Sequence, residues 1–152
     1  MRRLFSLKHE FATEWYRFLQ SVTPPVIAFD LTPERFPFQL RGRTITLHQC
    51  DVFVLLKRTG GGAPTGSLSI SLTKPDRERV VNPEARPDGS TAWPLPPDPS
   101  FGNLRHANIA GINAEIGGML NGLRSYTWSL TLTGVATPAE VEDVVVVCQF
   151  TA

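Results

Sequence analysis

The chain has 152 residues, of which 41% are hydrophobic and 19% charged, and 15 basic residues against 14 acidic ones give a formal net charge of +1. A charge this close to zero supplies no field able to hold a phosphate backbone or an anionic membrane, so we expect neither nucleic acid nor a membrane as a partner. No apolar run approaches the ~20 residues that span a bilayer, and Lys8, His9 and Glu10 stand where a signal peptide would have its apolar core. We expect one domain over residues 1–152, because a chain of this length buries roughly 68–70% of its unfolded surface in one core.

The first expected element is a short amphipathic helix over residues 13–20. One helical face is apolar and mostly aromatic, and it consists of Phe11, Trp15, Phe18 and Leu19. Pro24 and Pro25 prevent the helix from continuing. A helix this short is not stable alone in water, so we expect it to dock on the sheet with Trp15 as its anchor. Core packing explains these aromatic residues better than a binding role.

The stretch from Arg35 to Lys57 is predicted to be the central strand. Its apolar residues alternate with polar ones, as in a strand with one buried face: Phe36, Phe38, Leu40, Ile45, Leu47, Cys50, Val52, Val54 and Leu56. The alternation changes parity at His48 and Gln49, which predicts a β-bulge. Gly42 predicts a tight corner at the entry to the strand.

Four further strands and two single helical turns are predicted from local pattern. The strands are Val26 to Leu31, Ser67 to Thr73, Tyr126 to Thr133, and Asp143 to Thr151. Four successive valines, Val144 to Val147, suggest that the last strand is covered on both faces. Thr32 and Thr137 each precede a proline and an acidic residue, which is the pattern of a one-turn helix.

The remaining segments carry weaker patterns. The glycine-rich stretch 58–66 predicts a flexible loop, and its glycines lack the spacing of a phosphate-binding loop. Short edge pieces are expected at Val80-Val81 and at Thr91 to Trp93, with a tight turn at Asp88-Gly89 between them. Residues 94–99 form a proline-rich run, which we expect to cross a sheet edge rather than to bind an SH3-type groove.

Residues 106–123 combine a helical spacing of isoleucines with four glycines that weaken a helix. We expect a strand or irregular segment near Ala107 to Ile109, then a loop or helical turn, and a bend at Asn121-Gly122. In total the sequence predicts a mainly β fold, an antiparallel β-sandwich of about six to eight strands with a short N-terminal helix.

No constellation of residues with known chemistry is evident. The three histidines, His9, His48 and His106, lie far apart, and His48-x-Cys50 is a weak pattern for zinc. Motifs of serine hydrolases and zinc peptidases are missing from the sequence, so we expect no catalytic residue, no metal, no cofactor and no enzymatic activity. The two cysteines, Cys50 and Cys148, each lie in a predicted strand; we favour two buried free thiols, with a disulfide as the alternative.

Three blocks of sequence carry a family resemblance. The first is Phe5-Ser6-Leu7 with Phe11 and Glu14-Trp15-Tyr16-Arg17-Phe18-Leu19. The second is Phe29-Asp30-Leu31, Glu34-Arg35-Phe36-Pro37-Phe38 and Arg41-Gly42-Arg43-Thr44-Ile45. The third is Trp128-Ser129-Leu130-Thr131-Leu132-Thr133-Gly134 with Asp143-Val144-Val145-Val146-Val147-Cys148. Together they resemble the C-terminal region of the A component of bacterial Tc (toxin complex) insecticidal toxins. The resemblance follows the same order along most of the chain, and residues 59–102 form a variable region.

This resemblance implies a non-enzymatic docking domain that binds the B component, or a B–C fusion, to assemble a toxin-delivery complex. In that family the full A component is a pentamer, so a homo-oligomer is implied in that context. The implied location is secreted or extracellular as part of the complex, without a signal peptide of its own, and cytoplasmic before release. The matched blocks resemble core positions, so they imply no particular partner-binding residue.

A second hypothesis belongs to another class of function. Loops with glycine, asparagine and aromatic residues, such as Trp93, Phe101 and Asn103, are compatible with a carbohydrate- or receptor-binding β-sandwich. That these loops are simple connectors is the better-supported interpretation of the sequence alone. Gene neighbourhood would discriminate the two functions, because a toxin component encoded beside this chain favours the docking domain.

Overall fold

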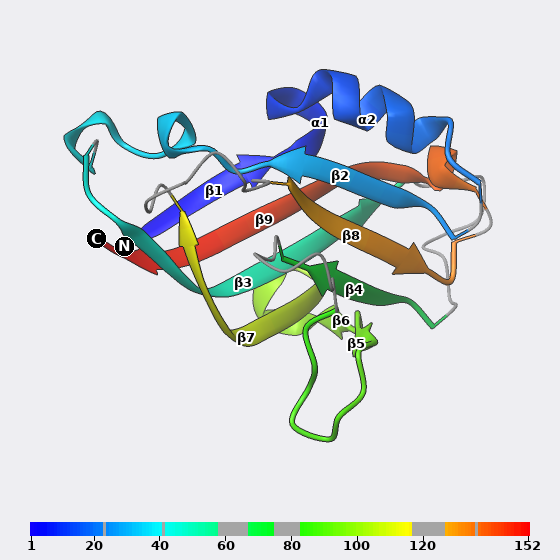
Figure 1. Ribbon diagram of the computed structural model, residues 1–152. Coiled ribbons are helices and arrows are strands. Elements are labelled where there is room, and N and C mark those ends of the chain that lie inside the picture. The colour runs from blue at the N-terminus through cyan, green and yellow to red at the C-terminus, as the bar shows by residue number, and fades with distance from the viewer. Residues whose placement is uncertain (23, 41, 58–66, 75–82, 117–126, 136) are drawn as a thin grey trace.

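The computed structural model describes residues 1–22, 24–40, 42–57, 67–74, 83–116, 127–135 and 137–152, and these form an antiparallel β-sandwich (Figure 1). One sheet has five strands in the order β1 (Arg2–Ser6), β9 (Val141–Thr151), β3 (Ile45–Leu56), β7 (Leu104–Ile116) and β6 (Pro97–Asp98). The other has four strands in the order β2 (Val26–Asp30), β8 (Thr127–Thr133), β4 (Ser69–Thr73) and β5 (Trp93–Pro94). The predicted architecture is confirmed, with nine strands in the described part of the chain, two of them only two residues long.

Each edge of the sandwich is closed by a different device. Strands β1 and β2 are edge strands of the two sheets, and the helices α1 (Leu7–Glu10) and α2 (Ala12–Leu19) lie along that side (Figure 1). At the opposite edge, residues 93–98 run from β5 in one sheet to β6 in the other. The single turns are η1 (Pro33–Arg35), η2 (Phe38–Leu40), η3 (Pro99–Phe101) and η4 (Pro138–Glu140).

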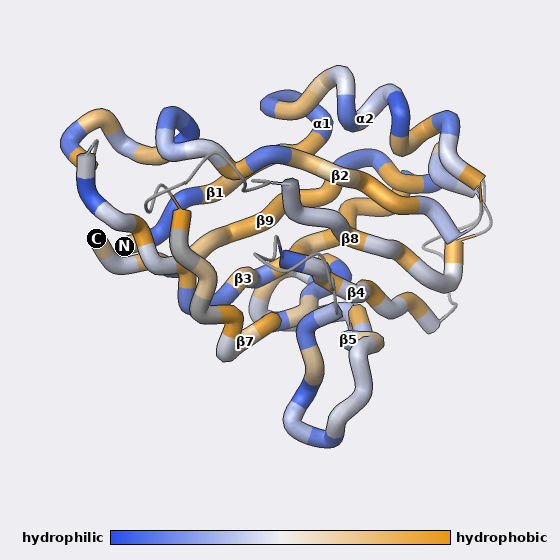
Figure 2. Tube along the Cα trace, in the orientation of Figure 1, coloured by the Kyte–Doolittle hydropathy of each residue, from blue (hydrophilic) through white to orange (hydrophobic). Residues whose placement is uncertain are grey.

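The core lies between the two sheets and beneath the helices. Figure 2 shows long apolar stretches along β9 and β3, whereas α2 alternates between apolar and polar segments. The inner positions of β3 are almost fully buried: Ile45, Leu47, Cys50, Val52 and Val54. Trp15 and Phe18 on α2 are buried as predicted, with ring centroids 4.9 Å apart, whereas Leu19 of the predicted face is partly exposed.

The predicted bulge in the central strand is confirmed. The register of β3 shifts between Leu47 and Gln49 against both neighbouring strands. On the β7 side Leu47 pairs with Ala114 and Gln49 pairs with Ala110, so three residues of β7 lie opposite His48. Gly111 opens this wide bulge with a φ of +75°, a conformation that glycine adopts without strain.

Several other predictions are confirmed by the described residues. The turns at Thr32 and Thr137, the turn at Asp88-Gly89, and the strands β2, β4, β8 and β9 form where the sequence placed them, to within a few residues. The proline-rich run crosses a sheet edge, as expected. Predictions for residues 58–66, Val80-Val81, Asn121-Gly122 and Tyr126 lie outside the described residues.

Four predictions need correction. A strand, β1, and the one-turn helix α1 precede the predicted helix. The segment from Phe36 to Leu40 forms a turn rather than the start of the central strand, and Phe38 is 72% exposed. The strand or irregular segment expected near Ala107 to Ile109 is a strand, but β7 continues to Ile116 where a loop or helical turn was expected, and residues 117–123 lie outside the described residues. On β9 the inner valines are buried, but Val145 and Val147 on the other face are only half-buried.

The two ends of the described chain lie next to each other (Figure 1). The amino group of Met1 donates a hydrogen bond of 2.9 Å to the carbonyl oxygen of Phe150. Among the described residues no helix has both the length and the apolar character needed to cross a membrane.

Candidate functional site

The outer face of the five-stranded sheet carries the most unusual combination of side chains in the described structure. Cross-strand pairing places Leu4, Val147, Asp51 and Asn108 in one row. The next row contains Ser6, Val145, Phe53 and His106. These side chains alternate with the buried ones, so they lie on the face that points away from the core. We call these two rows the outer face.

The polar centre of the outer face is the imidazole of His106, which lies between two carboxylates. Its Nε2 is 2.8 Å from Oδ1 of Asp51 on β3, and its Nδ1 is 3.0 Å from Oδ2 of Asp98 on β6. The side-chain amide of Asn108 donates to the same Asp51 oxygen over 2.8 Å. We call Asp51, Asp98 and His106 the histidine clamp.

Two aromatic rings enclose the imidazole. Phe53 stacks on His106 with ring centroids 4.5 Å apart and an interplanar angle of 13°. Phe101, from turn η3, meets both rings edge-on at 4.9 Å and 5.1 Å. This stacking limits access of water to the imidazole, which strengthens its contacts with the carboxylates.

Both ring nitrogens of His106 lie within hydrogen-bonding distance of a carboxylate oxygen. A neutral imidazole donates from one ring nitrogen and accepts at the other, whereas the imidazolium donates from both. The hydrogen bond from His106 is the main cause that lowers the pKa of Asp98, and the backbone N–H of Ser100 adds to it. Both ring nitrogens of His106 are therefore engaged by carboxylates in this arrangement.

Local backbone geometry delivers Asp98 to the clamp. Its side chain caps η3 by accepting from the N–H of Ser100 at 2.9 Å. The chain then reverses through Gly102 and Asn103, both left-handed with φ of +64° and +63°. The N–H of Asn103 donates to the carbonyl of Asp98 at 2.9 Å and closes the turn into β7.

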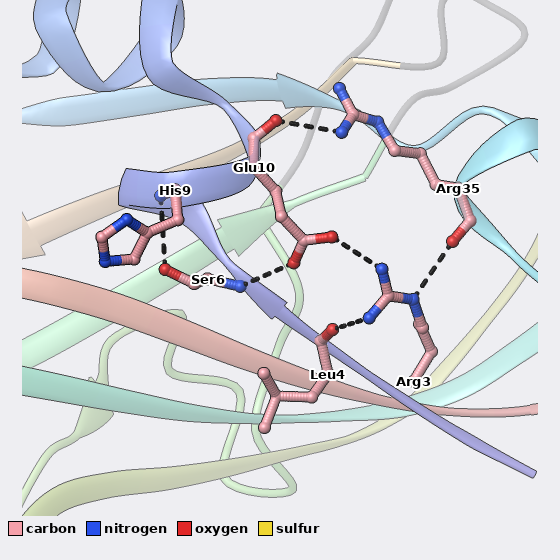
Figure 3. A network of polar contacts seen from close by, with 6 residues as sticks. All are labelled: Arg3, Leu4, Ser6, His9, Glu10 and Arg35. Atoms are coloured by element: carbon pink, nitrogen blue, oxygen red, sulfur yellow. Dashed lines mark hydrogen bonds and ion pairs between the residues drawn. The ribbon is translucent and has the colours of Figure 1, made fainter.

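A second polar network fastens the helical edge (Figure 3). Glu10 accepts from Arg3 Nη2 at 2.6 Å and from the N–H of Ser6 at 3.0 Å. Arg35 donates to the carbonyl of Glu10 at 2.9 Å, and its own carbonyl accepts from Arg3 Nε at 3.2 Å. The Arg35 guanidinium also lies 4.1 Å from the centroid of the Phe11 ring. The network therefore ties β1, α1 and η1 together.

The sequence missed the histidine clamp because its members are distant in the chain. His106 and Asp51 are 55 positions apart, and only the strand register brings them together. The available signal was the i, i+2 spacing of Asp51 with Phe53 and of His106 with Asn108, which puts each pair on one face of its strand.

The weak zinc pattern at His48 and Cys50 does not form a site. The bulge directs the two side chains differently: His48 Nε2 lies 2.8 Å from Thr151 Oγ1, whereas Cys50 is buried in the core. Among the described residues no group of three or more histidine, cysteine or acidic side chains is arranged so that it could hold a metal ion.

The aromatic residues considered for carbohydrate binding are placed differently from one another. Trp93 is buried, and its indole nitrogen donates to the carbonyl of Glu84 at 3.1 Å. It is therefore not available as a platform for a sugar. Phe101 packs on the histidine clamp and keeps about half of its surface exposed, and Asn103 occupies the turn beside it.

Comparison with known proteins adds no relative. No protein-family model matches the chain, and neither the curated proteins nor the solved structures contain a significant match.

Proposed function

We propose that this chain is a non-enzymatic docking domain that binds the B component of a Tc-type toxin. The sequence resemblance described above motivates the partner. The observation that carries the proposal is that the three resembling blocks, distant in sequence, contact one another.

Each pair of blocks is joined by a specific contact. Arg35 of the second block donates to the carbonyl of Glu10, within the span of the first. Phe29 of the second block pairs across strands with Trp128 of the third. Asp143 of the third block accepts from the hydroxyl of Ser6 in the first at 2.6 Å. The blocks thus form one structural unit, as expected if they were inherited together as a fold.

The outer face supplies a surface suited to a protein partner. Leu4 is 51% exposed, and its cross-strand neighbour Val147 is half-buried, as is Val145 in the next row. Apolar side chains on the open face of a sheet are a recurrent feature of protein interfaces. We assign the docking surface to the apolar half of the outer face, formed by Leu4, Val145 and Val147.

The proposal is tested by measuring binding of the purified chain to the B component, or to a B–C fusion, encoded by the same genome. We expect saturable binding in biolayer interferometry. The double variant Leu4→Glu/Val147→Glu should weaken it at least tenfold, because two charges would be buried without partners. Absence of binding by the unmodified chain refutes the partner.

A matched control separates the surface from the charge. Val22 is 84% exposed and lies between α2 and β2, so Val22→Glu adds a negative charge away from the outer face. Its binding should equal that of the unmodified chain. The proposed setting of this interaction is extracellular, as part of a toxin complex.

A further inference from the structure

Two cysteines face each other in the core of the five-stranded sheet. Cys50 on β3 is the direct cross-strand partner of Cys148 on β9. Their sulfur atoms are 3.7 Å apart, both thiols are free, and both side chains are almost fully buried. Residues 98 positions apart in the chain are therefore held in van der Waals contact through sulfur.

The cross-strand pairing at this position is compatible with a disulfide. Residues directly opposite each other on antiparallel strands have Cα atoms about 4.5 or 5.5 Å apart, depending on the hydrogen-bonding pattern. Disulfides need Cα separations of about 4.4–6.8 Å. Both values fall within this range, so the pairing of Cys50 with Cys148 is compatible with a disulfide.

We propose that Cys50 and Cys148 are the site of an intramolecular disulfide, formed by exchange with a low-molecular-weight disulfide while the chain folds. The thiolate of one cysteine attacks the small disulfide, forms a mixed disulfide and releases one small thiolate. The thiolate of the second cysteine then attacks the protein sulfur of the mixed disulfide and releases the second small thiolate. The protein loses two electrons and two protons, and the small disulfide is reduced to two thiols.

The timing follows from the burial of the pair. The thiol of Cys148 and burial in the core both raise the pKa of Cys50 well above its usual value. Exchange requires a thiolate that the oxidant can reach, so the closed sandwich protects the reduced pair. Oxidation therefore takes place before β9 pairs with β3 during folding. Once the sandwich has formed, the cysteine pair stays either reduced or disulfide-bonded.

This site does not depend on the proposed docking function. It predicts a difference between compartments: a chain that folds among reducing thiols keeps two free cysteines, whereas a chain that folds in an oxidising environment acquires a covalent link between two central strands. The same sequence would then exist in two forms of different stability.

The experiment compares refolding with direct oxidation. The full chain is unfolded and reduced in guanidinium, then refolded in a buffer of oxidised and reduced glutathione, and finally denatured and treated with iodoacetamide. We expect the refolded monomer to be lighter by two hydrogens and to accept no alkyl group in intact mass spectrometry. The native reduced protein, incubated in the same buffer, should still accept two alkyl groups.

A second measurement establishes that the disulfide belongs to the native fold. The oxidised monomer should keep the near-ultraviolet circular dichroism of the reduced protein and unfold at a temperature higher by about 5 °C or more. Cys148→Ala is the matched control, because it retains Cys50 and a small buried side chain but has no partner sulfur. Its unfolding temperature should not respond to the glutathione buffer.

Three outcomes overturn the proposal. The first is a refolded monomer that still accepts two alkyl groups. The second is a monomer that carries glutathione on its cysteines instead of an internal bond. The third is an internal bond that lowers the unfolding temperature or abolishes the native dichroism, because such a bond would be incompatible with the sandwich.

Discussion

The two edges of this sandwich are closed by different physical means. At the helical edge, α1, α2 and η1 cover β1 and β2 with an aromatic cluster that consists of Phe5, Phe11, Trp15, Phe18, Phe29 and Phe36. At the opposite edge, residues 93–98 form a crossing segment that joins the two sheets. Within the described residues, its strand pairing is limited to the two-residue strands β5, which pairs with β4, and β6, which pairs with β7. The histidine clamp holds its far end to β3 and β7.

The comparison shows that an edge of the sandwich can be closed either by burial of apolar side chains or by polar contacts that depend on protonation. Apolar burial at the helical edge is insensitive to pH and only weakly affected by salt. The crossing segment buries Trp93 and Leu95, and the contact between Asp98 and His106 adds to the pairing of β6 with β7 in attaching it to the five-stranded sheet. We therefore expect the helical edge to contribute most to overall stability. The two carboxylates with lowered pKa values, Asp98 at the clamp and Glu142 beside α1, should make stability depend on acid pH.

The largest expected effect is at the helical edge. Trp15→Ala removes a buried indole that packs on Phe18, and we expect the free energy of unfolding to fall by about 3–5 kcal/mol. Urea denaturation measures this change. Tyr16→Ala, at an exposed position on the same helix, is the control and should change stability by less than about 0.5 kcal/mol. A loss below about 1 kcal/mol for Trp15→Ala would show that the helix is not anchored through its aromatic face.

The next effect is at the clamp. His106→Gln removes the imidazole that lies between Asp51 and Asp98, and with it both of its contacts to the carboxylates. We expect the free energy of unfolding to fall by about 1.5–3 kcal/mol, typical of hydrogen bonds to charged groups such as carboxylates. His9→Gln, at an exposed histidine, is the matched control. If both variants have the same stability, the clamp does not fasten the crossing segment.

Predictability from sequence also differs between parts of the fold. The strand β8 could be predicted because apolar and polar residues alternate strictly. In β3 the inner apolar residues recur at every second position with one change of parity at His48, where the bulge lies, and β9 is rich in valine. The extent of β7 beyond Ile109 could not be predicted, for a related reason. In the first half of β7 the odd-numbered residues face the core, as Ala107 and Ile109 do. After the bulge that begins at Gly111 the even-numbered residues face it: Ile112, Ala114 and Ile116. The resulting spacing of isoleucines imitates a helix.

Long-range pairing sets the limit for the remaining features. The strand β1 has only one fully buried residue, Phe5, so its five residues show no pattern until β9 pairs with them. The histidine clamp needs the registers of β3, β6 and β7 at once. Those registers are set by packing across the whole sheet. A short stretch of sequence therefore does not contain the information that determines them.

A smaller effect sharpens the comparison at the helical edge. Arg3 and Glu10 form an ion pair at 2.6 Å, but both side chains are partly exposed. A double-mutant cycle with Arg3→Gln and Glu10→Gln should give a coupling energy of about 1 kcal/mol or less. This coupling should decrease when salt is raised from 0.05 to about 0.5 M. A coupling above about 2 kcal/mol would mean that charge, rather than burial, closes this edge.

The smallest effect is confined to acid pH. The lowered pKa of Asp98 means that the unfolded state binds more protons than the folded state near and below the ordinary aspartate range. Its contribution to stability is therefore present above about pH 4 and is lost as the pH falls through its lowered folded pKa. Asp98→Asn should flatten the fall in stability between about pH 4 and pH 2 in urea titrations.

A second carboxylate provides the comparison for this acid titration. The pKa of Glu142 is also lowered, chiefly by its hydrogen bond to Lys8 of α1. Glu142→Gln should therefore flatten the acid titration without loosening the crossing segment. Hydrogen exchange at the amides of Leu95, Asp98 and residues 100–103 distinguishes the two variants, because only Asp98→Asn should accelerate it. Equal exchange in both variants would contradict the assignment of Asp98 to the clamp.

The hydrogen bond between Met1 and Phe150 has a mechanical consequence. The outermost strand β1 runs antiparallel to β9, and both ends of the chain meet at the same end of that ladder. Tension applied to the two ends would open the rungs between β1 and β9 one after another, like a zipper, instead of loading them all in shear. A modest force would thus separate β1 from β9 first. The remaining strands of the sheet would bear the force only after β1 has detached.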